Sequence, residues 1–580
     1  MCGLQGIFSQ VEDISPLRDA QSFNVLRHRG PDHADTYSGD KISIAHNKLS
    51  ILDDTSRSHQ PIKYERWVIA FNGEIYNYRD LADDLDLNNI VFDGDVLGPG
   101  FARYGNSLWE RLDGEFAIAI YDVERHSIVL ARDRFGAKPL HFAQDGKEWH
   151  FASEAKGIRL RTGHKINPDR VCLHLLLGPW APRTESWFSG VHNLPPGHFL
   201  RITSSSADIL PYWSPERGIS ETLERPLQDV IAASVKSRLT DAAPKALLLS
   251  GGIDSTVVAA LASRTSNVTA YTVRFPEAEH LDESESAYLT AITLGLTLRY
   301  VEVQCCSSAI GIWDKMAVAL EEPPTDAGYI GVWSLYEAIH ADGFRVALTG
   351  QGNDELWCGY RDEASHVFDT IGSNWVQRCS QHARRRVRAV TMKNEGRLFW
   401  DGPWLNAYLE EKKDWEALSR VELSNNEKAR SLSALQLAMQ TILQRNLDQE
   451  DRLAMAHSIE SRLPLLSNDL LTRAASHAEF DESSLNGADK LAFRQAANTI
   501  LFGRIANCPP KRSFPVPSVL FHKTCRDYVL DNWQRMRLQP PVAGLVNESA
   551  GLDDCKYVLE REPKLALYLF AIDRFAIKWF

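Results

Sequence analysis

Residues 247–261 read LLLSGGIDSTVVAAL, an apolar strand that runs through a glycine turn directly into a helix. The same alternation continues along the chain, with VTAYTVRF at 268–275, a helix expected after Asp282, LRYVEVQ at 298–304 and RVALTG at 345–350. Strands that alternate with helices are typical of a parallel, doubly wound sheet covered by helices. We therefore predict an α/β nucleotide-binding domain that continues into a helical C-terminal part.

The region up to about residue 200 has a different pattern. WVIAFNGEIYN at 67–77, GEFAIAIYD at 114–122 and HSIVLARD at 126–133 are short apolar or alternating runs between turn residues, which predicts an antiparallel-rich domain. The segment 201–220, RITSSSADILPYWSPERGIS, is rich in Ser, Pro and Gly, so the domain linker is expected there. We predict two domains, residues 1–205 and 225–580.

Composition narrows the class of protein. Of the 580 residues, 44% are hydrophobic and 24% are charged, as in ordinary globular proteins, and the net charge of −12 opposes nucleic acid as a partner. No apolar run approaches the roughly 18 to 20 residues of a membrane span, so no membrane partner is expected. Nine cysteines without a C-x-x-C pair predict neither a disulfide framework nor a zinc site, which favours a cytoplasmic protein.

The glycine turn within residues 247–261 carries Ser250, Asp254 and Ser255. Backbone amides at a helix N-terminus favour a polyanion, and hydroxyl groups add hydrogen-bond donors, so the turn could cradle pyrophosphate. The pattern S-G-G-x-D-S resembles the pyrophosphate loop of ATP pyrophosphatases, which cleave ATP between the α and β phosphates. The lysine of G-x-x-x-x-G-K-[ST] is absent from this turn, which disfavours γ-phosphate transfer. The simpler alternative is a plain strand-to-helix turn.

Cys2 directly follows the initiator methionine. Removal of that methionine would leave a free α-amine beside the thiol, which places a nucleophile and a base in one residue. On its own, Cys2 favours the simpler interpretation, a cysteine in a frayed terminus.

Further motifs follow Cys2 in a set order. They are RHRGPDH at 27–33, AHNKLSILD at 45–53, FNGEIYN at 71–77, DGDV at 93–96, LDGEFAIAIYD at 112–122 and RDRFGAKPL at 132–140. Together with MCGLQGIF they resemble the class II glutamine amidotransferase domain, which has an N-terminal nucleophile, over most of residues 1–200. The resemblance implies an α+β fold, the αββα sandwich, in which Cys2 attacks the carboxamide of glutamine.

By that resemblance, the Asn72 side chain and the Gly73 amide stabilise the oxyanion, Glu74 and Asp95 hold the α-ammonium group, and Arg29 orders the site and couples it to a second one. The implied glutamine-binding residues are Lys48, Leu49, Ser50, Ile51, Asn72, Gly73, Glu74 and Asp95. Lys48 stands where the family usually has arginine, and it offers a point charge without the bidentate fork. The alternative for N-G and D-G is hairpin turn chemistry.

The C-terminal half resembles the asparagine synthetase family in YTVRF at 271–275, EEPPTD at 321–326, LTGQGNDELWCGY at 348–360, DRLAMAHSIESRLPLL at 451–466 and KLAFR at 490–494. The resemblance implies ATP as a substrate with Mg²⁺. Asp254 and Asp354 would bind the metal, and Lys490 would stabilise charge that develops during adenylation and acyl transfer. The implied ATP-binding residues are Leu249, Ser250, Gly251, Gly252, Asp254, Ser255, Val273, Thr349 and Gly350.

Gln351 departs from this pattern, because the family motif usually reads G-E-G or G-D-G at that point. A neutral amide cannot accept a proton at pH 7. Either Glu322 or another nearby carboxylate substitutes, or ammonia needs no side-chain base, or the acceptor is not aspartate.

These observations lead to a functional hypothesis. Ammonia released at Cys2 reaches an acyl-adenylate near Ser250 and Gln351, and the expected partners are glutamine, ATP and a carboxylate acceptor, foremost aspartate, with a homodimer allowed. One alternative is the same chemistry on another carboxylate, for a specialised metabolite or cell-envelope amidation. Others are an intramolecular amide ligase of the β-lactam synthetase or lasso cyclase type, and a non-catalytic protein that only binds glutamine or nucleotide.

Overall fold

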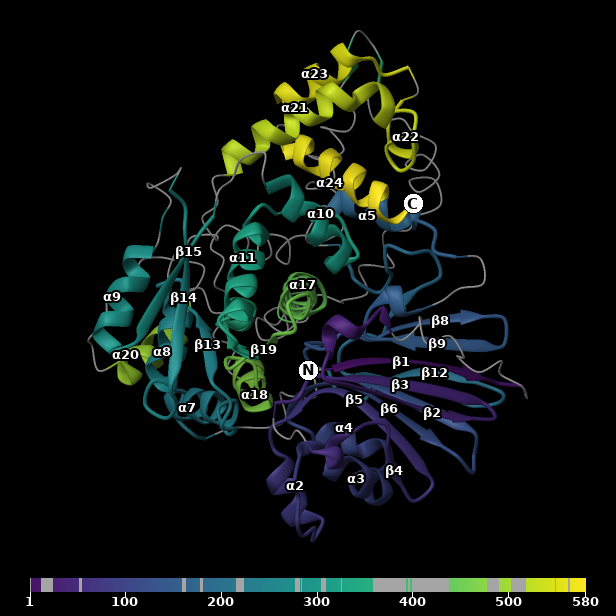
Figure 1. Cartoon of the computed structure of the whole chain (residues 1–580), viewed down its shortest axis with the longest axis vertical. Helices are drawn as coiled ribbons and strands as arrows, with labels where there is room; N and C mark the ends of the chain where they lie inside the picture. The colour runs from purple at the N-terminus through teal and green to yellow at the C-terminus, as the bar shows by residue number, and fades with distance from the viewer. Residues whose placement is uncertain are drawn as a thin grey trace.

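The computed structural model places two differently built halves side by side, and it has the N-terminal sandwich at the lower right of Figure 1. The residues that it describes are 2–11, 24–51, 55–158, 163–177, 181–214, 224–276, 282, 284–303, 309–324, 326–357, 393–394, 397–398, 435, 438–476, 490–501, 518–547, 549–561 and 564–580.

Two six-stranded antiparallel sheets form the N-terminal half. The first has the order β10-β8-β9-β1-β3-β2, with bounds β1 Cys2–Ser9, β2 His33–Gly39, β3 Ile42–Lys48, β8 His141–Asp145, β9 Glu148–Ala152 and β10 His192–Asn193. The second has the order β12-β11-β7-β6-β5-β4, with bounds β4 Ile62–Tyr64, β5 Trp67–Ile75, β6 Gly114–Asp122, β7 Ser127–Arg132, β11 His198–Ile202 and β12 Ala207–Pro211.

The sheets pack face to face because alternate residues of each strand are apolar and turn inward. Leu4 and Phe8 of β1 join Val68 and Ala70 of β5 in one buried cluster. Short helices α2 Tyr78–Asp84, α3 Leu97–Tyr104 and α4 Leu108–Arg111 cover the other face of the second sheet, where Phe71 packs with Leu97 and Trp109. This confirms the predicted two-sheet sandwich.

The C-terminal half is built on a five-stranded parallel sheet of order β15-β14-β13-β16-β19. Its strands are β13 Lys245–Leu248, β14 Val268–Arg274, β15 Thr297–Glu302, β16 Val346–Leu348 and β19 Glu460–Arg462. Helices cover both faces: Leu247 of β13 faces the cluster of α7 Leu227–Ser237 and α8 Ile253–Ala262, while Ala246 faces that of α10 Ala309–Leu320 and α11 Gly328–Ala341. The doubly wound prediction is confirmed.

The order in which strands are added to this sheet reverses between β13 and β16. The chain places β14 and β15 on one side of β13 and then places β16 on the other side. In open parallel sheets such a reversal leaves a crevice at the carboxyl ends of the strands, where ligands bind. The segments that follow β13 and β16 begin with Leu249 and Thr349, which places both nucleotide motifs at this point.

The chain ends in the helices α21 Ser518–Met536, α22 Val542–Leu545, α23 Leu552–Arg561 and α24 Lys564–Trp579, at the top of Figure 1. Apolar residues of α24 such as Phe570 and Ile572 are buried. Its charged residues pair instead, Asp573 with Arg535 at 2.7 Å and the Arg574 Nε with Asp314 at 2.7 Å. The apolar ending is thus a packed helix, and within the described residues no helix could span a membrane.

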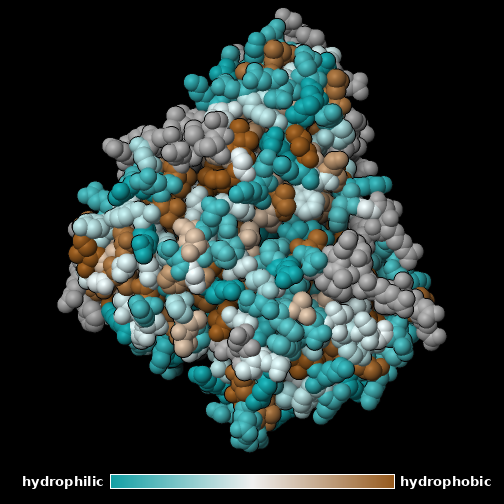
Figure 2. Space-filling model, in the orientation of Figure 1, coloured by the Kyte–Doolittle hydropathy of each residue, from teal (hydrophilic) through white to brown (hydrophobic). Residues whose placement is uncertain are grey.

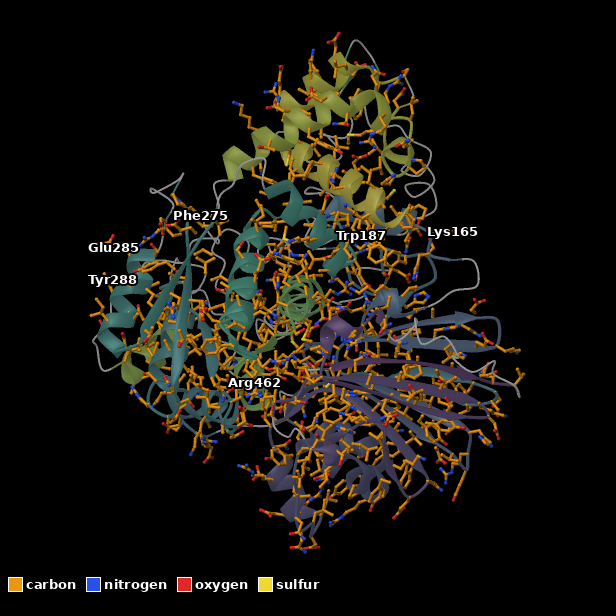
Figure 3. The ribbon with its side chains drawn as sticks, viewed as in Figure 1. Lys165, Trp187, Phe275, Glu285, Tyr288 and Arg462 are labelled. Atoms are coloured by element: carbon orange, nitrogen blue, oxygen red, sulfur yellow. The ribbon has the colours of Figure 1, made fainter. Side chains whose placement is uncertain are left out.

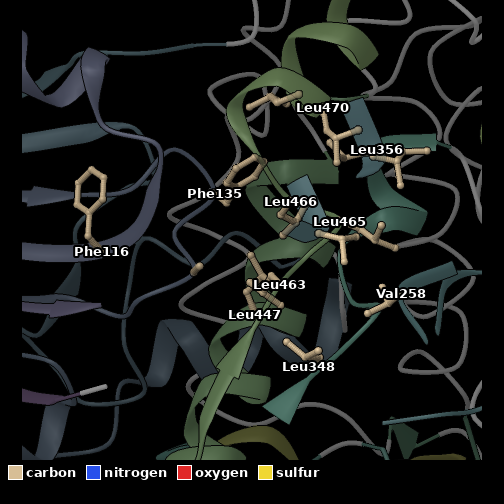
Figure 4. Close-up of a cluster of buried hydrophobic side chains, with 14 of the residues drawn as sticks. Phe116, Phe135, Val258, Leu348, Leu356, Leu447, Leu463, Leu465, Leu466 and Leu470 are labelled. Carbon is tan, nitrogen blue, oxygen red and sulfur yellow. The ribbon is translucent and has the colours of Figure 1, made fainter. Parts of the chain in front are cut away.

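One apolar cluster crosses the boundary between the halves. Figure 4 shows Phe116 and Phe135 of the sandwich with Leu447, Leu463 and Leu466 of the C-terminal half, and all five belong to the same buried cluster. The face of the molecule in Figure 2 is otherwise largely hydrophilic, with hydrophobic residues in small separate patches. The two halves therefore share a core. Residues 215–223, which join them, lie outside the described ranges, and the domain bounds of 205 and 225 stay predictions.

Candidate active sites

Cys2 opens β1 in the middle of the first sheet, opposite Lys48 of β3. Its amide nitrogen donates to the Asn72 Oδ1 at 2.9 Å, and its carbonyl accepts from the Arg29 Nε at 3.0 Å. Burial raises the pKa of the Cys2 thiol, while the N-terminal ammonium and the Leu49 amide act to lower it. Because a buried thiol resists ionisation, this nucleophile needs a base beside it.

Asn72 and Gly73 lie next to Cys2 on β5. The Asn72 side chain is fully buried, and its Nδ2 has no hydrogen-bond partner among the described residues. Gly73 has φ +141°, and a Cβ there would lie 1.9 Å from the Glu115 carbonyl oxygen, so only glycine fits. An unused buried donor is costly unless a ligand satisfies it, which suits the predicted oxyanion role.

The segment 48–51 leaves β3 along the same site. The Lys48 Nζ is buried and donates to the Ser58 Oγ at 2.6 Å. Leu49 and Ile51 pack on Met455 of the C-terminal half, and the Ser50 amide donates to the Asp32 Oδ2 at 2.8 Å. The proposed glutamine-binding segment is therefore in contact with both halves of the molecule.

The carboxylates of Asp93 and Glu460 act on Glu74, and sequence reasoning named neither of them but named Asp95. The Asp95 Oδ2 accepts from the amides of Val91 and Phe92 at 2.8 and 3.3 Å, and its role stays a prediction. Asp93 is more deeply buried and accepts from the Ile75 amide at 2.8 Å. Burial raises the pKa of Asp93 to about 7, and burial followed by the charges of Glu460 and Asp93 raises that of Glu74 well above its ordinary value.

Arg29 connects the two halves directly. Its fully buried guanidinium binds Glu154 and Asp451, each at 2.8 Å from Nη1. Asp451 belongs to α17 Gln444–Met455, a helix of the C-terminal half. Neither carboxylate was singled out from sequence, although Asp451 lies within the quoted DRLAMAHSIESRLPLL motif.

The second site lies at the crevice beyond β13 and β16. The Ser255 Oγ lies 3.3 Å from the Ser250 amide and 3.1 Å from the Ser250 Oγ, at the start of α8. Gly251 has φ +77°, and a Cβ there would approach Ser286 to 2.5 Å, so the turn requires glycine. A Cβ on Gly350 would lie 3.0 Å from Asp254, which brings the loops after β13 and β16 together.

Lys490 binds both aspartates of this site. Its buried Nζ lies 2.5 Å from the Asp254 Oδ2 and 2.6 Å from the Asp354 Oδ1, and Asn353 donates to the Asp254 Oδ1 at 2.6 Å. Two carboxylates thus converge on one cation at the carboxyl end of the sheet. Leu249 and Val273 are buried beside this end, with the Leu249 amide bound to the Tyr271 carbonyl at 2.8 Å.

Two carboxylates that could substitute for the one missing at Gln351, Glu322 and Glu355, have different environments. Glu322 is bound to Arg183 at 2.9 Å, Trp187 at 3.2 Å and Gln449 at 2.6 Å. Burial opposes its charge, but Arg183, with neighbouring arginines, outweighs burial and lowers the pKa of Glu322.

Glu355 on α12 Asn353–Trp357 has a different environment. One oxygen accepts from the Asn446 Nδ2 at 2.9 Å, and the Oε2 has no hydrogen-bond partner within the described part of the chain. Burial raises the pKa of Glu355, which suits a group that must take up a proton.

Comparison with known proteins agrees with this arrangement. A glutamine amidotransferase domain model matches residues 1–213, and an asparagine synthase model matches residues 226–553. A putative glutamine-hydrolysing asparagine synthetase of Mycobacterium tuberculosis is 28% identical over 557 residues, 86% of this chain and 84% of that protein.

Two fungal proteins are also similar. Amidase chry2 of Gibberella zeae is 28% identical over 404 residues, 64% of this chain and 60% of that protein. Amidase chyE of Penicillium rubens is 31% identical over 387 residues, 61% of this chain and 56% of that protein. These matches span less than two thirds of either amidase. Because the asparagine synthase model matches more than half of its residues, this chain belongs to the asparagine synthase family, with a glutamine amidotransferase domain at its N-terminal end.

Proposed function

We propose that this protein takes ammonia from glutamine and places it on a carboxylate activated as an acyl-adenylate. Aspartate is the first candidate for that carboxylate. The observation that carries the proposal is the pairing of two equipped sites in one molecule. The unused Asn72 Nδ2 lies beside Cys2, and Lys490 lies between Asp254 and Asp354 at the reversal point of the parallel sheet.

In the first step, the Cys2 sulfur attacks the carbon of the glutamine carboxamide, and the carbon–nitrogen bond breaks to leave a thioester on Cys2, which water then hydrolyses to glutamate. The α-amine left after removal of Met1 accepts the thiol proton and later gives it to the departing ammonia. The Asn72 Nδ2 and the Gly73 amide bind the oxyanion. Lys48 binds the α-carboxylate of glutamine. Glu74 and Asp95, joined in our proposal by Asp93, hold its α-ammonium group.

In the second step, the amides and hydroxyls of the turn at residues 250–255 hold the pyrophosphate of ATP, with Leu249, Val273, Thr349 and Gly350 along the nucleotide. Asp254 and Asp354 fit Mg²⁺, because both present hard carboxylate oxygens to one point that a cation, the Lys490 ammonium, already shares. A Mg²⁺ ion held by these residues would neutralise phosphate charge. Lys490 stabilises negative charge on the reacting oxygens as the acceptor carboxylate attacks the α-phosphorus of ATP and pyrophosphate leaves. Ammonia then attacks the acyl carbon and displaces AMP, and Glu355 accepts a proton from the attacking ammonia.

There are two candidates for the acceptor carboxylate. Aspartate is supported by the mycobacterial relative's name, putative asparagine synthetase. Gln351 favours a second candidate, a different carboxylate, because the missing carboxylate changes the charge next to the acceptor. The proposal also includes a cytoplasmic location and an allowed homodimer, which stay predictions.

The test is to supply the purified protein with glutamine, Mg-ATP and aspartate, and to quantify asparagine, AMP and pyrophosphate together. Equal amounts of the three products support the aspartate assignment. Glutamate release without asparagine moves the acceptor to another carboxylate.

The nucleophile is tested by Cys2→Ala. We expect loss of glutamine-driven AMP formation, because no other thiol in the described part of the chain lies beside Asn72, and retention of ammonia-driven AMP formation. Glutamine-driven turnover that survives this change would refute the Cys2 assignment. The buried Cys172, replaced by alanine, is the matched control and is expected to retain both activities.

A further inference from the structure

Strand β19 is the edge of the parallel sheet that borders the N-terminal half. Figure 3 labels Arg462, the last residue of this strand, at the junction of the two halves. On either side of it, the Lys138 Nζ binds the Ser461 carbonyl at 3.3 Å, and the Leu463 amide donates to the Glu115 Oε1 at 3.0 Å. This strand is therefore attached to the sandwich by several polar contacts.

The Arg462 side chain crosses into the glutamine site. Its Nη2 lies 3.4 Å from the Glu74 Oε1, and its Nε lies 2.5 Å from the Glu460 Oε1. The Nη1 binds the Asp241 carboxylate and the Arg238 carbonyl, the latter at 3.0 Å. The side chain is only 2% exposed, so this guanidinium has one fixed position among its partners.

The Arg462 main chain contacts the segment that enters the nucleotide site. Leu348 of β16 pairs in register with Arg462, and the Thr349 amide donates to the Arg462 carbonyl at 3.2 Å. Thr349 in turn accepts from the Gln351 amide through its Oγ1 at 3.2 Å. One residue thus touches the glutamine site with its side chain and the nucleotide loop with its backbone, and a rigid strand supports it.

We propose that Arg462 is a positioning residue for glutamine hydrolysis, supplied by the synthetase half, which holds the Glu74 carboxylate ready for the α-ammonium group of glutamine. The inference rests on the proposed function, in which Glu74 binds that group. Arg462 itself does not touch the reacting atoms.

Electrostatics support the geometry. Burial raises the pKa of Glu74 well above its ordinary value, Glu460 and Asp93 raise it further, and Arg462 acts in the opposite direction. Without the guanidinium, the pKa of Glu74 would rise further, so that at a given pH a larger fraction of Glu74 would be protonated and carry no charge for the ammonium. A protonated carboxyl group binds an ammonium ion much more weakly than a carboxylate does.

The experiment compares Arg462→Gln with the full-length wild-type protein, measuring glutamate release from glutamine over a range of pH. A hydrogen bond to a charged group contributes about 1.5–3 kcal/mol, so we expect KM for glutamine to rise about 10- to 150-fold at pH 7 with a smaller change in kcat. In the variant, KM falls again as pH rises, because Glu74 ionises without help. In the wild type the same fall in KM lies at lower pH, because Arg462 acts to lower the pKa of Glu74.

Asp241→Asn is the matched control, because it removes a carboxylate from the same guanidinium on the side away from Glu74. It should leave KM for glutamine within twofold. If Arg462→Gln does not fold, Arg462→Lys keeps the charge and should show a smaller rise in KM and a smaller shift of its pH dependence.

Ammonia-driven AMP formation separates this inference from the proposed function. It should stay within twofold in Arg462→Gln, since the backbone bond to Thr349 remains. Its absence from the wild type would refute the proposed ligase, while glutamate release would still test Arg462. An unchanged KM, or equal losses in Arg462→Gln and Asp241→Asn, overturns the inference.

Discussion

We propose that Glu355 takes the role of the carboxylate that is missing at Gln351. Glu322, the other carboxylate considered from sequence, is held by Arg183, Trp187 and Gln449, and its low pKa makes it a poor base. The Glu355 Oε2 is unpartnered among the described residues, and its charge interacts with those of Lys490 and Asp254. We therefore assign the proton acceptor in our proposed mechanism to Glu355.

Glu355→Gln should lower kcat for ammonia-driven amide formation by about 10²- to 10⁴-fold, the usual contribution of a positioned base, and leave glutamate release intact. Burial raises the pKa of Glu355, so the wild-type rate should climb as pH rises through that pKa, and the variant should lose this limb. Initial rates of AMP formation with ammonium salts across pH provide the measurement.

Glu450→Gln is the control for a buried carboxylate, since Glu450 on α17 binds Tyr336 and Ser461 instead. A comparable rate loss in both variants would show that burial of charge matters here, not proton transfer at Glu355.

Single residues differed in how far sequence could predict them. Asn72, Gly73, Asp254 and Lys490 belong to local motifs, and the structure brings each motif to one of the two sites. The partnership of Arg462 with Glu74 joins residues 388 positions apart, and no local pattern specifies that pairing. Asp93 was missed within DGDV because both aspartates fit the motif, and only burial distinguishes them.

Helix α17 shows the same limit at the level of an element. Its sequence, QRNLDQEDRLAM, resembles a solvated helix, yet Asn446, Asp448, Gln449, Asp451 and Arg452 are all buried. The helix lies between the two halves, and its charges find partners from the sandwich. Such burial follows from domain packing, which hydrophobic periodicity does not report.

Asp448 on α17 provides a test of this packing. It binds Arg132 at 2.8 Å and Arg183 at 2.9 Å, two guanidinium groups of the N-terminal half. Asp448→Asn leaves both cations buried with less compensation, so we expect the free energy of unfolding to fall by about 3–5 kcal/mol. Urea titration followed by tryptophan fluorescence measures the change.

The exposed pair of Arg201 and Asp208, 3.2 Å apart, supplies the control for that titration. Asp208→Asn should change the free energy of unfolding by less than about 1 kcal/mol, because exposed pairs contribute little. Similar losses from the two substitutions would mean that α17 is not a site of compensated buried charge.

At the scale of the molecule, the sequence predicted the fold of each half better than the packing of the two halves against each other. Strands that alternate with helices indicated the doubly wound sheet, and short alternating runs indicated the sandwich. The shared core of Phe116, Phe135, Leu447 and Leu466 could not be predicted, because each of these residues also fits the core of its own half.

His141, which lies where the two halves meet, should make the stability of the protein depend on pH. It lies in β8 of the sandwich, is buried, and accepts a hydrogen bond at Nε2 from the Arg452 Nη2 of α17 at 2.9 Å. Burial, helped by the charge of Arg452, lowers the pKa of His141 to about 3. The folded protein therefore keeps this imidazole neutral at pH values where the unfolded chain, with an ordinary pKa near 6.5, binds a proton.

The sign of the pH dependence follows from proton binding. Between about pH 6.5 and 3 the unfolded state binds more protons at this site, so stability falls as pH falls, by up to about 1.4 kcal/mol per pH unit. His141→Gln keeps an acceptor for Arg452 but cannot titrate. Between pH 7 and pH 5, the wild type should therefore lose about 2 kcal/mol more stability than the variant, as measured by urea midpoints and slopes.

His46 provides an independent comparison inside the sandwich. Its pKa is also lowered to about 3, chiefly by burial, and its Nε2 lies 3.0 Å from the Phe71 carbonyl. His46→Gln should remove a similar pH dependence, and the double variant should remove about twice as much, because among the described residues the two imidazoles contact different groups. Parallel stability curves for wild type and His141→Gln would mean that the junction of the two halves does not hold a neutral imidazole.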